Sequence, residues 1–484
     1  MNAILRRSIT AALAACVVIP VTASATNGYF SHGWGTKSKA MAGVATALPQ
    51  DTLVTATNPA GMAFVGTSLD LGVSFFNPSD RGYEANPDFP TQMVPATDPS
   101  GMANFNVPFP TGPFVTPGEY DSDRDWFLIP SFGYNRELDS KSTIGVAVYG
   151  NGGLNTSYRD RPVWENFAPA PNQRVINGQP VVATNPPLPL DQGGRVIIDN
   201  GQPIPVTAPI PGSVNGNPGG FLTATTPTGV NLEQLFIEVP FTYKIGDGKQ
   251  SVGIAPVFAA QVFEAKGLQP FRAASVSPDK VTNNGKDWSY GFGVHVGWFG
   301  EINDQLSAGI SYRTKMWMSE FDEYEGLFAD GGDFDIPAMF NLGLAYKAKP
   351  NVTVGFDYQH LFYNEVDAIA NSNDNDISPC FTSGPKPAFC LGGKDGLGFG
   401  WDSMDVFKLG LRYDHNEKLS FMAGASYNTE FSSGRQALFN VLAPATIRWH
   451  LTLGASYRHS DSDAFNFAFA YMPKETLDGT SPQI

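Results

Sequence analysis

The chain has 484 residues, of which only 16% are charged, while glycine (51), proline (38) and phenylalanine (35) are abundant. This composition argues against a helical bundle or an acidic disordered chain, and it favours many short strands joined by turns. The net charge of −15 argues against a nucleic-acid partner, because phosphate recognition requires a basic surface.

The first 25 residues have the layout of an export signal. Two arginines precede an apolar run from Ile9 to Val21, and the small residues "ASA" stand just before Thr26. This layout predicts a signal peptide over residues 1–25 and a mature chain that starts at Thr26. The alternative is lipoprotein cleavage at Cys16 in "LAAC", but apolar "VVIP" follows where a lipoprotein normally turns polar.

Residues 26–66 contain no obvious strand or long helix, and they end in the turn "ATNPAGMAFVG". In this turn Pro59 fixes φ, Gly61 permits a reversal, and the amide of Asn58 can hydrogen-bond local backbone. No later stretch has the about 18 consecutive apolar residues that a spanning helix needs. If the chain crosses a membrane, it therefore does so as a barrel.

From about residue 67 onward, apolar residues alternate with small or polar ones. In "WSYGFGVHVGW" every second residue from Trp288 to Trp298 is apolar, and the residues between them are serine, glycine and histidine. This period of two predicts β-strands with one apolar face. The predicted strands lie at 67–76, 126–136, 142–150, 234–245, 250–264, 287–299, 305–319, 336–347, 351–363, 403–414, 418–429, 446–458 and 464–472.

A soluble β-sandwich shows the same alternation, but three features favour a transmembrane barrel. Several strands reach the about 9 to 11 residues that cross a bilayer at a tilt, and aromatic residues gather at strand ends. Short turns such as "EIND" and "HNEK" alternate with long segments at 77–125, 151–230 and 364–402. We therefore predict an all-β fold, a transmembrane antiparallel β-barrel whose long loops are extracellular.

The predicted strands are odd in number, whereas bacterial single-chain barrels have an even number. The chain also ends in "PKETLDGTSPQI", without a final aromatic strand. Two explanations stay open: a last strand is absent from this sequence, or one strand has escaped detection. The first explanation predicts an incomplete barrel with two unpaired edges.

The segment "NGYFSHGWGTKSKAMAGVATALPQDTLVTATNPAGMAF" resembles the start of the FadL family of outer-membrane transporters for long-chain fatty acids and aromatic hydrocarbons. The phrases "LEQLFIEVPFTYKIG" and "SVGIAPVFAAQVFEAKGL" carry the resemblance further along the chain. It implies a monomeric barrel of fourteen strands in the outer membrane of a Gram-negative bacterium. It also implies that residues 26–66 form a hatch plugging the lumen of a barrel made by residues 67–484.

The resemblance gives roles to two groups of residues. The turn residues Asn58, Pro59, Ala60 and Gly61 end the hatch and become candidates for its gate. An inward kink in the third strand would open the wall for sideways exit, and glycines permit such a break in the ladder. The candidates for this lateral opening are Tyr149, Gly150, Asn151, Gly152, Gly153 and Leu154. An ordinary loop start is the alternative.

Cys380 and Cys390 flank "FTSGPKPAF", and in an exported chain this spacing predicts a disulfide that closes a surface loop. Two free thiols are the alternative, while zinc would need further ligands and no histidine stands beside the pair. The acidic loop "NEVDAIANSNDND" is a candidate calcium site, weighed against an ordinary solvated loop. We predict no metal and no cofactor.

The chain contains no zinc-protease motif, nucleophile elbow or phosphate loop. His295 and His450 could join a lipase site with a serine, but the polarity of a barrel lumen explains them more simply. We therefore predict a passive transporter and not an enzyme. Its partners would be a fatty acid or an aromatic hydrocarbon, detergent in vitro, and outer-membrane lipid. A porin for polar solutes and a surface adhesin or structural barrel are the alternatives.

Overall fold

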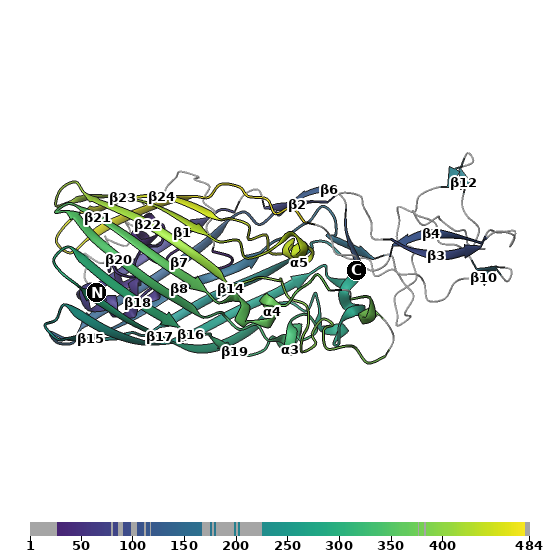
Figure 1. Cartoon of the computed structure of the whole chain (residues 1–484), viewed down its shortest axis with the longest axis horizontal. Helices are drawn as coiled ribbons and strands as arrows, with labels where there is room; N and C mark the ends of the chain where they lie inside the picture. Colours follow the sequence, from purple (N-terminus) through teal and green to yellow (C-terminus); the bar gives the residue numbers. More distant parts are fainter. Residues whose placement is uncertain are drawn as a thin grey trace, which may run out of the picture.

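The computed structural model shows one large antiparallel sheet with an internal plug, and five small two-stranded sheets in addition (Figure 1). The predicted signal peptide lies outside the described residues. The described residues are 27–78, 81–85, 91–97, 104–110, 113–116, 118–166, 175–176, 179–180, 198–199, 202–203, 225–375, 377–381 and 384–479.

Fifteen strands form the main sheet, and thirteen of them follow one another in a single hydrogen-bonded order. That order is β1 (Ser68–Phe76), β7 (Phe127–Glu137), β8 (Ser142–Asn155), β14 (Gly229–Glu238), β16 (Gln250–Lys266), β17 (Asp287–Glu301), β18 (Leu306–Arg313), β20 (Met339–Lys349), β21 (Val352–Leu361), β22 (Met404–Asp414), β23 (Leu419–Asn428), β24 (Trp449–Arg458) and β25 (Ala464–Tyr471). Two short strands, β15 (Phe241–Ile245) and β19 (Trp317–Met318), lie off this order and pair with its members. Each predicted strand corresponds to one position in the sheet.

The strands have an apolar outer face, as their alternation predicts. In β1, Leu69, Leu71 and Phe75 are exposed, whereas Asp70 faces inward and binds the plug. Large exposed apolar side chains recur on the other strands of the sheet. Contiguous apolar surface on this scale suits lipid rather than water, so the outer face is the membrane-facing surface of a barrel. None of the helices in the described ranges is long and apolar enough to cross a membrane.

The two ends of the strand order are β1 and β25, and among the described residues no pairing joins them. The N-terminal plug contacts both ends. Lys39 donates from Nζ to Ser74 Oγ of β1 at 2.7 Å, and the backbone N–H of Ala42 donates to Thr452 Oγ1 of β24, beside β25, at 2.9 Å. The plug therefore bridges the two sides of the sheet where the ladder is interrupted.

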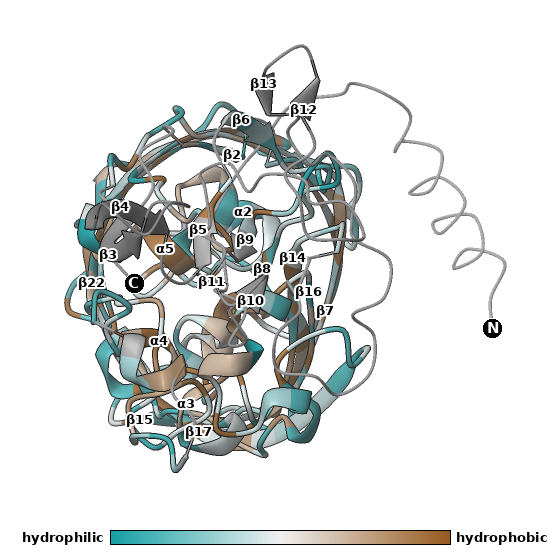
Figure 2. Ribbon diagram, turned by 90° about the vertical axis from the view of Figure 1, so that its right-hand side faces the viewer, coloured by the Kyte–Doolittle hydropathy of each residue, from teal (hydrophilic) through white to brown (hydrophobic). Residues whose placement is uncertain are grey.

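The plug contains α2 (Thr36–Ala40), η1 (Thr52–Ala56) and η2 (Pro59–Phe64), which lie inside the sheet near one end (Figure 1). A view along the sheet shows α2 within the ring of strands (Figure 2). Smaller elements occupy the long connections at the other end. They are β2 (Gly82–Ala85), β3 (Thr91–Thr97), β4 (Asn104–Pro110), β5 (Pro113–Val115), β6 (Gly118–Asp121), β9 (Trp164–Asn166), β10 (Val175–Ile176), β11 (Gln179–Pro180), β12 (Ile198–Asp199), β13 (Gln202–Pro203), η3 (Gln269–Ala274), η4 (Pro278–Lys280), η5 (Asp322–Tyr324), α3 (Ala329–Gly332), η6 (Tyr363–Glu365), α4 (Asp367–Ala370), η7 (Ser378–Phe381), η8 (Gly434–Gln436) and α5 (Ala437–Asn440).

Inward-facing glycines let the plug lie directly against the backbone of the strands. A Cβ added at Gly424 would overlap the carbonyl carbon of Met41, and one at Gly309 would overlap the carbonyl oxygen of Thr46. Plug backbone also comes this close at Gly253 and Gly343. Plug side chains occupy the corresponding space at Gly133, Gly145, Gly297, Gly355, Gly410 and Gly454. The absence of side chains at these positions is therefore what makes room for the plug.

We predict that Gly424→Val displaces the plug without disrupting the strand. Valine suits a β-strand, but its side chain would occupy the space of Met41 and Ala42. The expected result is a rise in background conductance in planar lipid bilayers, with the heat-modifiable gel mobility of a folded barrel retained. Ala423→Val is the matched control, because Ala423 is the preceding residue and faces the opposite side of the same strand. Equal conductance in both variants would contradict this prediction.

Candidate transport passage

An apolar pocket lies at the loop end of the barrel. Its wall combines Phe263 of β16, Phe271 of η3 and Phe439 of α5 with residues of the long loops. The rings of Phe271 and Phe439 meet edge to face with their centroids 5.3 Å apart. The complete lining is Val230, Phe263, Leu268, Phe271, Leu327, Phe328, Ala368, Leu391, Leu397, Gly398, Phe399, Phe439 and Leu442. The pocket encloses only about 30 Å³, so its apolar wall would have to open before it could hold an apolar ligand.

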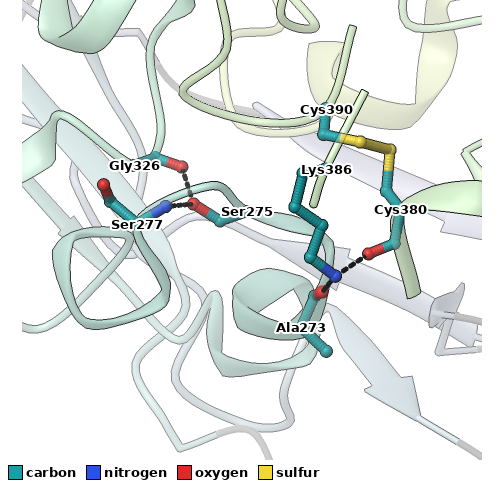
Figure 3. The surroundings of a disulfide bond; sticks show 7 residues. All are labelled: Ala273, Ser275, Ser277, Gly326, Cys380, Lys386 and Cys390. Carbon is teal, nitrogen blue, oxygen red and sulfur yellow. Dashed lines mark hydrogen bonds between the residues drawn. A yellow bond between two sulfur atoms is a disulfide. The ribbon is translucent and has the colours of Figure 1, made fainter. Parts of the chain in front are cut away.

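The two cysteines lie in a loop that contributes Leu391 to this wall. Figure 3 shows the surroundings of their disulfide. Cys380 and Cys390 are joined by a disulfide, with their Cα atoms 5.6 Å apart. Lys386, between them, donates from Nζ to the carbonyl oxygen of Ala273 in η3 at 2.7 Å. Leu391, directly after the second cysteine, lines the pocket. The cysteine loop and η3 are thus held together at the pocket rim.

The acidic loop that is a candidate calcium site follows β21 and folds partly into η6 and α4. Its Asp374 forms an ion pair with Arg435 at 2.7 Å. Within the described part of the chain, no group of three or more histidine, cysteine, aspartate or glutamate side chains is arranged to hold a metal ion. Calcium binding by this loop stays a prediction.

A cluster of buried aromatic rings continues inward from the pocket to the first residues of the plug. Tyr29 and Phe30 of the plug pack against Tyr363, with ring centroids 5.4 and 5.8 Å apart. Tyr363 also packs against Trp401, and its hydroxyl donates to the carbonyl oxygen of Asn27 at 2.6 Å. These rings and the apolar side chains of the pocket wall belong to one continuous hydrophobic core. Apolar packing is therefore continuous from the loops to the plug.

The third strand of the barrel, β8, leaves its neighbour at the residues predicted to form a kink. β8 pairs with β7 up to Tyr149, while residues 127–130 of β7 pair only with β1. Beyond that point the plug takes the place of β7. The N–H of Ser31 donates to the carbonyl oxygen of Asn151 at 2.9 Å, and that of Gly153 donates to the carbonyl oxygen of Tyr29 at 3.0 Å.

A register shift in the pairing of β8 with β14 accompanies this change of partner. Gly150 is opposite Leu235 and Gly152 is opposite Gln234, so Asn151 is the additional residue of a β-bulge. A Cβ at Gly152 would overlap the carbonyl oxygen of Tyr29, so glycine is required there for the close approach. The alternative of an ordinary loop start does not describe this segment, because β8 continues to Asn155 and includes Leu154. Use of the bulge for lateral exit stays a prediction.

Buried polar side chains surround the inner side of the bulge. Tyr149 donates its hydroxyl to Glu238 Oε2 at 2.8 Å, and Glu238 Oε1 lies 2.6 Å from His295 Nδ1. Arg313 donates to Asn151 Oδ1 at 3.2 Å and, more weakly, to the Tyr149 hydroxyl at 3.5 Å. The sequence pointed to Tyr149, Asn151 and His295 but not to Glu238 or Arg313. Glu238 and Arg313 both stand at inward-facing positions of predicted strands, and those positions were the available signal.

The predicted gate residues form the start of η2 and lie deep in the barrel. Asn58 is fully buried and caps η2, with its Oδ1 accepting from the N–H of Ala60 at 3.1 Å. Its Nδ2 donates to the carbonyl oxygens of Thr46 and Trp298, both at 2.9 Å. Pro59 is the first residue of η2, and Gly61 packs against Val54. Asn58 therefore links two parts of the plug to the wall, and its role as a gate stays a prediction.

Two inward carboxylates anchor the plug elsewhere, and sequence reasoning missed both. Asp357 of β21 accepts from the N–H groups of Ala45 and Thr46, each at 2.9 Å. Asp70 of β1 accepts from the N–H and the hydroxyl of Thr52 at 2.9 and 2.8 Å. A charged residue on the inner face of a predicted strand was the available signal. Hydrogen bonds to charged acceptors are stronger than neutral ones, so these contacts hold the plug firmly.

A lipid-facing antiparallel barrel whose lumen is filled by its own N-terminal segment defines a plugged outer-membrane transport barrel. The chain belongs to the outer membrane protein transport protein family (OMPP1/FadL/TodX), whose sequence profile matches residues 229–479. Membership confirms the predicted family, the β-barrel fold and a location in the outer membrane of a Gram-negative bacterium. The protein is therefore an outer-membrane transport protein.

Solved structures of similar fold support the architecture. The toluene transporter TodX of Pseudomonas putida is 16% identical, with a TM-score of 0.54 and coverage of 91% of this chain and 92% of that chain. A FadL homologue of Pseudomonas aeruginosa is 12% identical, with a TM-score of 0.52 and coverage of 94% of both chains. Identities this low establish the fold alone. A search of curated proteins found no match.

We predict that Asn58→Ala loosens the plug more than it destabilises the barrel. The substitution removes three hydrogen bonds and leaves two buried carbonyl oxygens without this donor, at a cost of about 1–3 kcal/mol to the closed plug. The strands keep their own ladders. We expect faster protease cleavage of the plug, with an unchanged unfolding temperature of the barrel. A variant that matched the wild-type protein in plug protection would refute the assignment.

We also predict that Asp51 makes closure of the plug depend on pH. Burial, and next the negative charge of Asp70, raise the pKa of Asp51 to about 7. If opening returns this carboxyl to water, its pKa falls, so the closed plug binds one proton more than the open plug in this pH range. The stability of the closed plug therefore falls as pH rises through about 7. Between about pH 6 and about pH 8, the ratio of open to closed plug should rise about tenfold through this group.

The measurement for Asp51 is the frequency of opening events in planar bilayers, compared between the wild-type protein and Asp51→Asn at each pH. Asparagine keeps the cap that Asp51 Oδ1 provides to the N–H of Leu53, but it does not titrate. The ratio of the opening frequencies of the two proteins separates the contribution of this carboxyl from that of other titrating groups. A ratio that does not change with pH would show that Asp51 has no such role.

Proposed function

We propose that this protein carries hydrophobic small molecules passively across the outer membrane. A molecule enters at the extracellular loops, passes through the apolar pocket and the aromatic rings, and leaves sideways through the wall beside Asn151. The observation that carries the proposal is the continuous hydrophobic core, which extends from Phe271 and Phe439 in the pocket wall to Phe30 beside the bulge. Such a route keeps an apolar solute away from water.

The packing of the plug argues against the alternative functions. A porin for polar solutes needs a water-filled lumen, whereas here the plug lies against strand backbone at inward glycines such as Gly309 and Gly424. An adhesin would use the loops and would not need a plug. We infer that residues 26–66 act as a hatch within a barrel of residues 67–484. We infer further that Asn58, Pro59, Ala60 and Gly61 take part in its movement.

The classes of substrate that fit best are aromatic hydrocarbons and long-chain fatty acids. Similar solved structures are named as toluene transporters, from Pseudomonas putida and Ralstonia pickettii, and one as a FadL homologue. Transport of this kind requires no catalytic residue and no cofactor, so we propose that the protein is not an enzyme. One chain carries the whole route, which supports function as a monomer that releases its substrate into membrane lipid.

Uptake by proteoliposomes and growth of a null strain test this proposal with toluene and with oleate. We expect the wild-type protein to accelerate the uptake of at least one of the two, and to restore growth on it. A variant that lacks residues 27–66 should no longer select hydrophobic over polar solutes and should leak small polar solutes. Uptake that does not differ between protein-containing and empty liposomes, for both compounds, would exclude the proposed function.

A further inference from the structure

The side chain of Arg313 is fully buried at the end of β18, and its charge is covered mainly by aromatic rings. Its guanidinium carbon lies 4.7 Å from the ring centroid of Phe236, 5.6 Å from that of Phe30 and 5.8 Å from that of Trp34. Within the described part of the chain, Arg313 forms no ion pair. Its terminal nitrogens donate to Asn151 Oδ1 at 3.2 Å and to the Tyr149 hydroxyl at 3.5 Å, and its Nε has no hydrogen-bond partner. The faces of the three rings add to these two hydrogen bonds in stabilising a desolvated cation.

These rings belong to two parts that must separate when the plug moves. Phe236 is part of the wall in β14, whereas Phe30 and Trp34 are part of the plug. The backbone of Phe30 pairs with Gly152, and the indole of Trp34 donates to the carbonyl oxygen of Gly150 at 3.2 Å. The same plug segment therefore covers Arg313 and holds the bulge of β8. Movement that frees the bulge also uncovers the guanidinium.

An uncovered and buried guanidinium is costly unless another group replaces the lost ring. An aromatic solute supplies a π face of the same kind as Phe30, whereas a saturated solute of equal size does not. A carboxylate would also attract the cation, but Glu238 lies close by, joined to Arg313 through the hydroxyl of Tyr149. A second carboxylate at this place would have to lie close to Glu238, whose oxygens already contact Tyr149 and His295.

We propose that Arg313 determines specificity for aromatic solutes, because an incoming ring replaces Phe30 on the guanidinium and thereby releases the bulge at Asn151. The inference rests on the proposed function and narrows it to uncharged arenes. Arg313 acts here as a binding residue in the passage, and the charge of its side chain is the property that matters.

Toluene and methylcyclohexane form a matched pair for the test, because they share size and carbon skeleton but only toluene has a π face. The uptake rate of each compound into empty liposomes is first subtracted from its rate into proteoliposomes. With the wild-type protein, the remaining rate should be about tenfold higher for toluene than for methylcyclohexane, which is equivalent to about 1.4 kcal/mol. Arg313→Met should bring this ratio close to one. Arg313→Lys, which keeps the cation, should retain part of the preference.

Arg448→Met is the control variant. Arg448 lies over the ring of Tyr427 at 5.1 Å, in a partly exposed site just before β24, so its loss should leave the ratio unchanged. Heat-modifiable gel mobility establishes that each variant forms a folded barrel, and Arg313→Lys keeps the test decisive if Arg313→Met does not assemble.

Three results would overturn the inference. The first is equal uptake of toluene and methylcyclohexane by the wild-type protein. The second is an unchanged preference in both Arg313 variants. The third is loss of oleate uptake in Arg313→Met with the toluene ratio intact, which would identify a carboxylate site instead. Failure of the wild-type protein to transport any of the three compounds would instead exclude the proposed function itself.

Discussion

The structure depends on direct packing of the plug backbone against the backbone of the barrel strands. This packing is possible only because the inward position of strand after strand is glycine, as at Gly253, Gly309 and Gly424. A side chain at any of them would hold the two backbones apart. The plug has only a small core of its own, made by Ala45, Val54 and Met62. Its fold, which has only short helices, is defined by the surface of the wall that surrounds it.

The short turns of the plug pair many of its backbone groups internally, and the wall supplies partners for some of the others. The N–H groups of Ala45 and Thr46 have their acceptor in Asp357, and the N–H of Thr52 has its acceptor in Asp70. Buried backbone groups are costly when they lack partners. Removal of one such carboxylate would therefore act on the plug far from the substitution in sequence, while the strand that carries it keeps its ladder.

Much of the barrel could be predicted from the sequence, because the alternation of apolar and polar residues is a local property. Each predicted strand is present, and the bulge near Asn151 was indicated by the glycines around it. The anchoring of the plug could not be predicted in the same way. Asp357 and Ala45 are more than 300 residues apart in the sequence, and no local pattern connects a strand carboxylate with a particular loop N–H. The rings around Arg313 come together for the same non-local reason.

The interior of the barrel has two chemically distinct halves, and their boundary explains the position of the bulge. The outer half is lined by aromatic and aliphatic side chains, whereas the inner half holds the plug through carboxylates, amides and close backbone contacts. An apolar solute that follows the outer half would meet a polar and tightly packed region if it continued inward. The bulge of β8 and the first residues of the plug lie at this boundary. The lateral exit that we propose beside the bulge would spare such a solute this polar region, because the adjacent wall faces hydrocarbon.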